Sequence, residues 1–159
     1  MRIRIGFGFD THQLDFNHEF WLGGVLITHY KGATGHSDAD TLIHAIIDAL
    51  LGAAGLRDIG TLFPDTAPEL RGIDSKVMLS DTMKLIASRG FVIGNIDSTI
   101  VLQCPKIGPH IPAMIETLSA VMNIGADQLS IKAKTSEKLG FIGREEGISA
   151  YAVALLNKE

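Results

Sequence analysis

The sequence has few of the features that mark secreted, membrane-spanning or nucleic-acid-binding proteins. Its 159 residues include one cysteine, Cys104, so an intrachain disulfide is impossible and a reducing compartment is expected. No apolar run approaches the roughly 18 residues that a membrane span needs, and no signal peptide is visible. The net charge of -4 offers no basic surplus for nucleic acid or anionic membranes. We therefore expect a cytoplasmic protein with no nucleic-acid or membrane partner.

The chain also lacks internal repeats and Gly/Pro-rich linkers, which predicts a single domain over residues 1–159. Alternating or β-branched segments predict strands at 2–9, 91–103 and 129–134, and one bent strand at 21–27. Helical spacing of apolar residues predicts helices at 38–54, 74–88 and 110–122, the first capped by Ser37 or Asp38 and closed by Gly55. The Ala-rich segment 147–156 fits either a strand or a helix. Interleaved strands and helices indicate an α+β or α/β fold.

Asp10 and His12 are two residues apart at the end of the first predicted strand, so their side chains share one face. An Asp that accepts a hydrogen bond from a His is a common surface arrangement. The alternative is that both are metal ligands, which requires a third ligand.

His44 is the candidate third ligand. It lies within a largely apolar predicted helix, where Asp40, His44 and Asp48 form one polar stripe. A core histidine paired with Asp40 or Asp48 is one interpretation. The other joins His44 to Asp10 and His12, which gives three zinc ligands and one open position, as in catalytic sites.

Phosphate binding is suggested by cations and hydroxyls in segment 132–138, which follows a predicted strand, and by the Gly-rich segment 140–144 that ends on Arg144. Glu137 would suit this environment if a divalent cation bridged it to phosphate. The alternative is a solvated charged turn. Segments 35–38, 58–60, 63–66 and 103–109 are further candidate binding loops, and each can equally be a helix cap or an ordinary turn.

Several motifs in order resemble those of the 2-C-methyl-D-erythritol 2,4-cyclodiphosphate synthase family. The resemblance spans nearly the whole chain and rests on these segments: Gly8-Phe9-Asp10-Thr11-His12, Gly23-Gly24-Val25, His36-Ser37-Asp38-Ala39-Asp40, His44-Ala45, Asp48 to Ala54, Asp58-Ile59-Gly60, Phe63-Pro64-Asp65, Pro105-Lys106 and Glu137 to Arg144.

This resemblance implies an α+β fold, with a mixed four-stranded sheet covered on one face by helices, and a homotrimer with active sites between subunits. The final segment is then a strand. The implied enzyme is a phosphorus-oxygen lyase of the non-mevalonate isoprenoid pathway. It converts the cytidine diphosphate compound 4-diphosphocytidyl-2-C-methyl-D-erythritol 2-phosphate to 2-C-methyl-D-erythritol 2,4-cyclodiphosphate and CMP.

The resemblance also implies roles for individual residues. Zn²⁺ would bind Asp10, His12 and His44, whereas Mg²⁺ or Mn²⁺ would bind Glu137 and the diphosphate. His36 and Thr135 would stabilise the transition state. Asp10, His12 and His36 would also bind substrate. The erythritol phosphate side would be lined by Ser37, Asp58, Ile59, Gly60, Phe63, Pro64, Asp65, Thr66 and Ala67. Residues around the cytidine diphosphate would be Leu102, Gln103, Cys104, Pro105, Lys106, Ile107, Gly108, Lys134, Thr135, Ser136, Glu137, Phe141 and Arg144.

Lys134 and Ser136 stand where the family form has threonines, and Leu102 and Cys104 where it has alanines. Two other functions remain as alternatives. One is a metal-dependent phosphoesterase that hydrolyses a nucleoside diphosphate with water at the open zinc position. The other is a diphosphate-binding module that has lost turnover.

Overall fold

The computed structural model describes residues 2–158 and contains one main sheet with the strand order β4-β1-β7-β5-β6. β1 pairs antiparallel with β4 and β7, β7 pairs antiparallel with β5, and β5 pairs parallel with β6, so the sheet is mixed. The strands are β1 (Arg2–Phe16), β4 (Lys31–Ala33), β5 (Phe91–Val101), β6 (Leu129–Lys134) and β7 (Gly147–Lys158).

The expected count of four strands was wrong, because the sheet has five. The first strand was predicted to end at Phe9 but continues to Phe16, since β7 pairs with it as far as Gln13. Its last residues then pair with the short β4, where Leu14 lies opposite Ala33. Asp10 and His12 consequently lie inside a strand rather than at its end.

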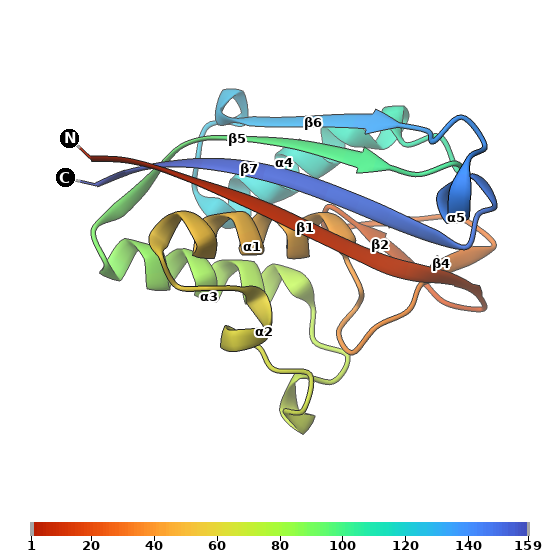
Figure 1. Cartoon of the computed structure of the whole chain (residues 1–159), viewed down its shortest axis with the longest axis horizontal. Coiled ribbons are helices and arrows are strands. Elements are labelled where there is room, and N and C mark those ends of the chain that lie inside the picture. The colour runs from red at the N-terminus through yellow and green to blue at the C-terminus, as the bar shows by residue number, and fades with distance from the viewer. Residues whose placement is uncertain (1, 159) are drawn as a thin grey trace.

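The main helices cover one face of the sheet (Figure 1). They are α1 (Thr41–Ala54), α3 (Ser75–Ser88) and α4 (Ile111–Met122), which agree with the predicted segments to within three residues. Short turns of helix also occur: α2 (Ile59–Leu62), α5 (Gly140–Gly143) and three 3-10 turns at Pro68–Leu70, Gly108–His110 and Ala126–Gln128. None of the helices within residues 2–158 is long and apolar enough to cross a membrane.

Helix α1 lies between the sheet and α3 (Figure 1), and 11 of its 14 residues are buried. Gly6 and Gly8 of β1 allow this close packing. A Cβ atom added to either glycine would lie 1.9 Å from a backbone oxygen of α1, at Ala49 and Ala45 respectively. β1 and α1 therefore touch backbone to backbone.

The N-cap of α1 differs from the prediction. Asp40, rather than Ser37 or Asp38, caps the helix by accepting a hydrogen bond from Ile43 N at 3.0 Å. The same carboxylate also accepts the backbone N–H groups of Gly23 at 2.9 Å and Gly24 at 2.7 Å. This contact with the Gly23–Gly24 turn explains why Asp40, rather than Ser37 or Asp38, caps the helix. Gly55 ends the helix with a left-handed φ of 73°, as predicted.

The predicted bent strand at 21–27 is instead a hairpin of two strands, β2 (Phe20–Leu22) and β3 (Val25–Ile27). Gly23 and Gly24 both have positive φ, at 60° and 74°. Two such residues form the tight turn that reverses a chain between paired strands. The glycine pair was therefore a turn signal and not a bulge.

The Ala-rich C-terminal segment is the strand β7, which lies between β1 and β5. Its alanines at 150, 152 and 154 are buried toward the helices. Tyr151 and Val153 point to the opposite face, where they are 39% and 42% exposed. Small residues on the helix side leave room for α1, which explains why an Ala-rich sequence forms a central strand here.

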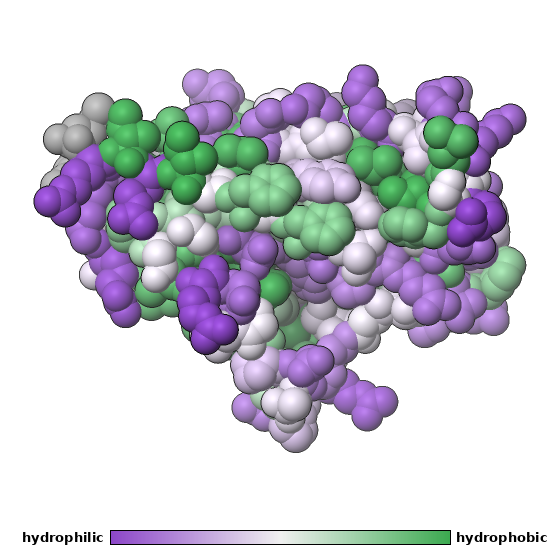
Figure 2. Space-filling view, in the orientation of Figure 1, coloured by the Kyte–Doolittle hydropathy of each residue, from purple (hydrophilic) through white to green (hydrophobic). Residues whose placement is uncertain are grey.

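The sheet face opposite the helices carries exposed hydrophobic side chains, which gather along β1 in Figure 2. In β1 they are Ile3, Ile5, Phe7 and Phe9, at 44–68% exposure, and β7 adds Tyr151 and Val153. Phe9 and Tyr151 contact each other with ring centroids 5.1 Å apart. We call these six residues the outer apolar face. A contiguous patch of this kind is typical of a protein-protein interface.

Replacing Gly8 by Ala should destabilise the fold, because the new Cβ would lie 1.9 Å from Ala45 O and 2.6 Å from Ala49 N. Overpacking of this kind typically lowers the free energy of unfolding by about 1–3 kcal/mol. Denaturant unfolding at a fixed protein concentration measures the change.

Gly52→Ala is the matched control, because its Cβ would meet no atom closer than 3.9 Å. An interior helical Gly→Ala change commonly adds about 0.5–1 kcal/mol. Equal stability of Gly8→Ala and the unmodified protein would contradict the close contact between β1 and α1.

Candidate metal centre and neighbouring pockets

The side chains of Asp10, His12 and His44 converge on one point, which agrees with the interpretation that joins His44 to Asp10 and His12. Asp10 Oδ2 lies 3.0 Å from His12 Nε2 and 3.0 Å from His44 Nδ1. The two imidazole nitrogens are 3.1 Å apart. The three donor atoms thus form a nearly equilateral triangle.

The backbone explains this convergence. Gly6, Gly8, Asp10 and His12 alternate along β1 on the face that meets the helices. The glycines bring α1 into contact with β1, and His44 on the first turns of α1 then lies opposite Asp10 and His12. The same alternation that predicts a shared face therefore also sets the distance to the helix.

Hydrogen bonds on the far side of each imidazole orient its lone pair. His12 Nδ1 lies 2.8 Å from the carbonyl oxygen of Thr34. Because a carbonyl only accepts, Nδ1 carries a proton. Nε2 faces Asp10, to which it donates when protonated, and it can bind a cation when the imidazole is neutral. His44 Nε2 lies 2.9 Å from Ser75 Oγ and 3.1 Å from Ser37 Oγ, which leaves Nδ1 facing the triangle.

The alternative in which His44 is a core histidine paired with Asp40 or Asp48 is wrong. Asp40 caps α1 and binds the β2–β3 turn. Asp48 accepts the backbone N–H of Ile59 at 3.1 Å. Both carboxylates have other partners, whereas Asp10 contacts His44 directly.

Asp10 and His12 each shift the pKa of the other toward its charged form. Burial alone would raise the pKa of Asp10, but hydrogen bonds from His12 and His44 outweigh it and lower that pKa to about 2. Burial would lower the pKa of His12, but its hydrogen bond and charge interaction with Asp10 prevail and raise it. Asp10 is therefore an ionised carboxylate that attracts a cation.

The triangle fits zinc. A tetrahedral zinc ion with bonds of about 2.0–2.2 Å separates its ligand atoms by roughly 3.3 Å. The observed edges of 3.0–3.1 Å require only a slight expansion. With two nitrogens and one oxygen supplied by the chain, the fourth position remains for water or substrate, which is the pattern of catalytic rather than structural zinc sites.

The cluster lines a pocket of about 430 Å³. The predicted substrate-binding residues that line it are Asp10, His12, His36, Ser37, Ile59, Gly60, Phe63, Pro64 and Asp65. The imidazole of His36 contacts the backbone through Nε2, which lies 3.1 Å from the carbonyl oxygen of Ala67. The predicted residues Asp58, Thr66 and Ala67 are not among the lining residues, and Asp58 instead caps α2 through Thr61 N at 2.9 Å.

Sequence reasoning missed three residues around the cluster. Leu70 and Met78 add apolar lining. Ser75 contacts His44, and both its hydroxyl and its backbone N–H are also bonded to the Asp38 carboxylate. The position of Ser75 at the start of a predicted helix suggested only a cap, so no sequence signal linked it to a histidine 31 residues away.

A second pocket of about 340 Å³ opens where the parallel strands β5 and β6 end. Neighbouring strand ends of this kind commonly form binding sites. The predicted residues that line it are Leu102, Gln103, Pro105, Lys106, Ile107, Gly108, Lys134 and Thr135. Pro109 and Ala133 of the candidate segments 103–109 and 132–138 also line it, and Ile111 was missed. The predicted residues Cys104, Ser136, Glu137, Phe141 and Arg144 are absent from its lining.

Glu137 and Arg144 have local partners. Thr135 Oγ1 donates to Glu137 Oε1 at 3.0 Å in an exposed loop. Arg144 makes a two-point ion pair with Glu146, through Nε at 3.0 Å and a terminal nitrogen at 2.9 Å. Within residues 2–158 Glu137 does not join the Asp10–His12–His44 group. The two pockets share no lining residue within one chain.

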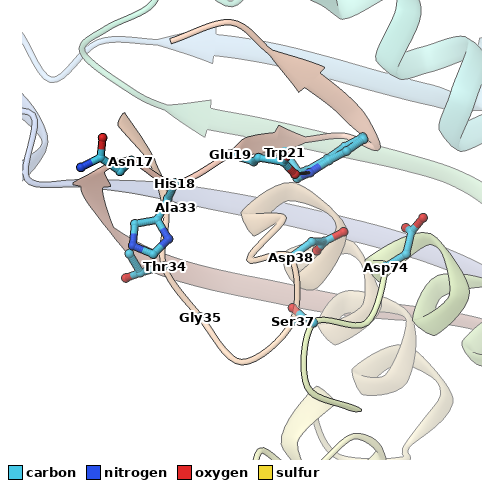
Figure 3. A pocket seen from close by; sticks show the side chains of 11 residues that line it. Asn17, His18, Glu19, Trp21, Ala33, Thr34, Gly35, Ser37, Asp38 and Asp74 are labelled. Atoms are coloured by element: carbon cyan, nitrogen blue, oxygen red, sulfur yellow. Dashed lines mark hydrogen bonds between the residues drawn. The ribbon is translucent and has the colours of Figure 1, made fainter. Parts of the chain in front are cut away.

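A third hollow of about 510 Å³ is lined in part by the segment 33–38. Figure 3 shows the side chains around it, among them Trp21, Asp38 and Asp74. Ser37 lines both this hollow and the pocket of the metal cluster. Gly35, Ser37 and Asp38 of the candidate segment 35–38 line it, and of these only Ser37 was predicted to bind substrate.

Removing one ligand should abolish tight metal binding. Loss of a residue that only hydrogen-bonds to a metal ligand typically weakens metal binding by about 10–100-fold. His44 is a candidate ligand itself, so we expect His44→Ala to weaken zinc binding by more than this. Equilibrium dialysis followed by zinc analysis measures this. The control is His18→Ala, since His18 is exposed and outside the cluster. Equal zinc content in His44→Ala and His18→Ala would contradict the ligand assignment.

Comparisons with known proteins cover nearly the whole chain. Residues 3–157 match the model of the YgbB family. The 2-C-methyl-D-erythritol 2,4-cyclodiphosphate synthase of Bacteroides fragilis is 61% identical over 158 residues, which are 99% of this chain and 99% of that protein. A CDP-bound structure of a 2C-methyl-D-erythritol-2,4-cyclodiphosphate synthase has a TM-score of 0.89 and 42% identity, covering 97% of this chain and 100% of that one. The bifunctional IspDF of Campylobacter jejuni has a TM-score of 0.95 and 37% identity, covering 99% of this chain and 43% of that one.

Proposed function

The chain belongs to the YgbB family, with relatives named 2-C-methyl-D-erythritol 2,4-cyclodiphosphate synthase, and we propose on this basis that it catalyses the cyclisation that gives them their name. The substrate is 4-diphosphocytidyl-2-C-methyl-D-erythritol 2-phosphate, and the products are the 2,4-cyclodiphosphate and CMP. The enzyme is a lyase of non-mevalonate isoprenoid biosynthesis. The observation that carries the proposal is the Asp10–His12–His44 triangle inside a pocket lined by the predicted substrate residues.

The reaction is an intramolecular substitution at phosphorus. An oxygen of the 2-phosphate forms a bond to the β-phosphorus, and the bond from that phosphorus to the bridging oxygen of CMP breaks. No nucleophile from the protein is needed, so positioning and neutralisation of charge are the protein's tasks. Binding at two pockets fixes both ends of the substrate, which raises the effective concentration of the attacking phosphate.

We assign Zn²⁺ to Asp10, His12 and His44, and Mg²⁺ or Mn²⁺ to Glu137 together with the diphosphate. When bound, these ions neutralise phosphate charge and polarise the phosphorus-oxygen bonds. The chain's own contribution is to orient the ligands. Thr34 O and the Ser75 hydroxyl fix the two imidazoles, and Thr135 Oγ1 holds Glu137.

His36 and Thr135 are the proposed transition-state residues. His36 lines the metal pocket and is oriented by Ala67 O, so its imidazole is available to a phosphate beside the metal ligands. Thr135 lines the pocket at the ends of β5 and β6. We assign this second pocket to the cytidine diphosphate, where backbone groups of the segment after β5 are available to read the base.

We further propose a homotrimer of single-domain subunits in the cytoplasm, with active sites between neighbours. Two observations support the assembly. The outer apolar face leaves Ile5 68% and Phe7 62% exposed, which favours burial against another subunit. The two pockets also have no lining residue in common, so a site that uses both is most simply built from two chains.

The reaction is tested by phosphorus NMR of the purified protein with this substrate and Mg²⁺, beside a metal-stripped control. We expect cyclic diphosphate and CMP only in the metallated sample. A linear phosphate product would instead identify a hydrolase. Unchanged substrate with fully metallated protein would identify a diphosphate-binding module without turnover.

Phe7→Asp should disrupt the proposed trimer, because it places a carboxylate at the centre of the outer apolar face. Light scattering coupled to gel filtration is expected to give a monomer mass for this variant. Val77→Asp is the control, since Val77 is 48% exposed on α3, in the helix layer on the opposite side of the sheet. A trimeric Phe7→Asp variant, or a monomeric unmodified protein, would refute the interface.

A further inference from the structure

We propose that His29, Cys104 and Glu145 form a second metal site, which takes a thiophilic divalent ion such as Zn²⁺. A ring nitrogen of His29, the Cys104 sulfur and a carboxylate oxygen of Glu145 all lie within 4.8 Å of one another. The three residues come from separate segments, before β4, after β5 and after α5. This cluster is distinct from the Asp10–His12–His44 group and shares no residue with it.

The histidine has an unmet bonding requirement. His29 Nε2 is buried and has no hydrogen-bond partner among residues 2–158. A buried polar atom without a partner is unfavourable, so most such atoms are satisfied by protein, water or an ion. Burial also lowers the pKa of His29, and a neutral imidazole retains the lone pair that a metal needs.

The surroundings hold the ligands in place as partners of metal ligands usually do. The His29 ring contacts the rings of Tyr30 and Phe20, with centroids 4.2 and 6.2 Å away. The Tyr30 hydroxyl donates to Glu145 Oε2, and Lys31 Nζ donates to Glu145 O at 2.7 Å. Both ends of Glu145 are thus anchored, with its carboxylate toward the cluster.

The donor set selects the type of ion. Nitrogen, thiolate sulfur and carboxylate oxygen favour zinc and related transition metals over Mg²⁺ or Ca²⁺, which prefer oxygen ligands. Around a tetrahedral zinc, nitrogen and sulfur ligands lie about 3.5 Å apart. The three donor atoms lie within 4.8 Å of one another, so a bound ion would draw them closer together. A fourth position remains for water.

The single cysteine permits a selective test. Co²⁺ bound to thiolate gives a charge-transfer absorption band in the near ultraviolet, and Cys104 is the only residue of the chain that can produce one. We expect Co²⁺ titrated into the metal-stripped, thiol-reduced full chain to produce this band. Cys104→Ser should lose the band and bind one fewer equivalent of Co²⁺ per chain. Its visible spectrum from Co²⁺ at Asp10, His12 and His44 should persist, which shows that the variant is folded.

His29→Ala and Glu145→Gln should each weaken the Co²⁺ affinity measured by the charge-transfer band at least tenfold, with His18→Ala as the matched control at wild-type affinity. Absence of the band in the reduced wild-type chain would overturn the proposal. So would a band of unchanged affinity in both His29→Ala and Glu145→Gln, because the thiol would then be binding the ion without its neighbours. Neither result depends on turnover, so the proposed cyclisation stands or falls separately.

Discussion

The backbone contact between β1 and α1 sets the position of every ligand in the Asp10–His12–His44 cluster. Gly6 and Gly8 remove the side chains that would hold the helix away. The buried alanines of β7 likewise present only small side chains to the helices. Donor atoms 3.0–3.1 Å apart on a strand and a helix are possible only because these two elements lie so close.

The cluster also ties metal binding to the stability of the tertiary structure. Its ligands belong to two elements, and the groups that orient them belong to the segment before α1 and to the start of α3. A cation bound there therefore stabilises the folded arrangement of all four segments by mass action. The carboxylate of Asp10 also favours the protonated imidazole of His12, so its hydrogen bond and charge raise the pKa of His12 against the opposing effect of burial.

The sequence predicted the main helices and the shared face of Asp10 and His12 well, because both depend on local periodicity. Alternation placed Asp10 with His12, and helical spacing placed His44 on a buried helix. Features decided by distant contacts were missed. Asp40 caps α1 and also binds the Gly23–Gly24 turn. Pairing with β7 continues β1 past the predicted end at Phe9. Ser75 contacts His44 from the start of α3. The roles assigned to the site residues all stay predictions, and Glu137, Phe141 and Arg144 line neither pocket within one chain.

The separation of the two pockets has a genetic consequence. Suppose that active sites lie between subunits, as proposed. A chain with a substituted metal ligand then still carries an intact pocket at the ends of β5 and β6. A chain with a substitution in that pocket still carries an intact Asp10–His12–His44 cluster. Two inactive alleles, one defective at His44 and the other at Thr135, would then complement each other when expressed together. Mixed trimers would regenerate functional sites at those interfaces where the two undamaged halves meet.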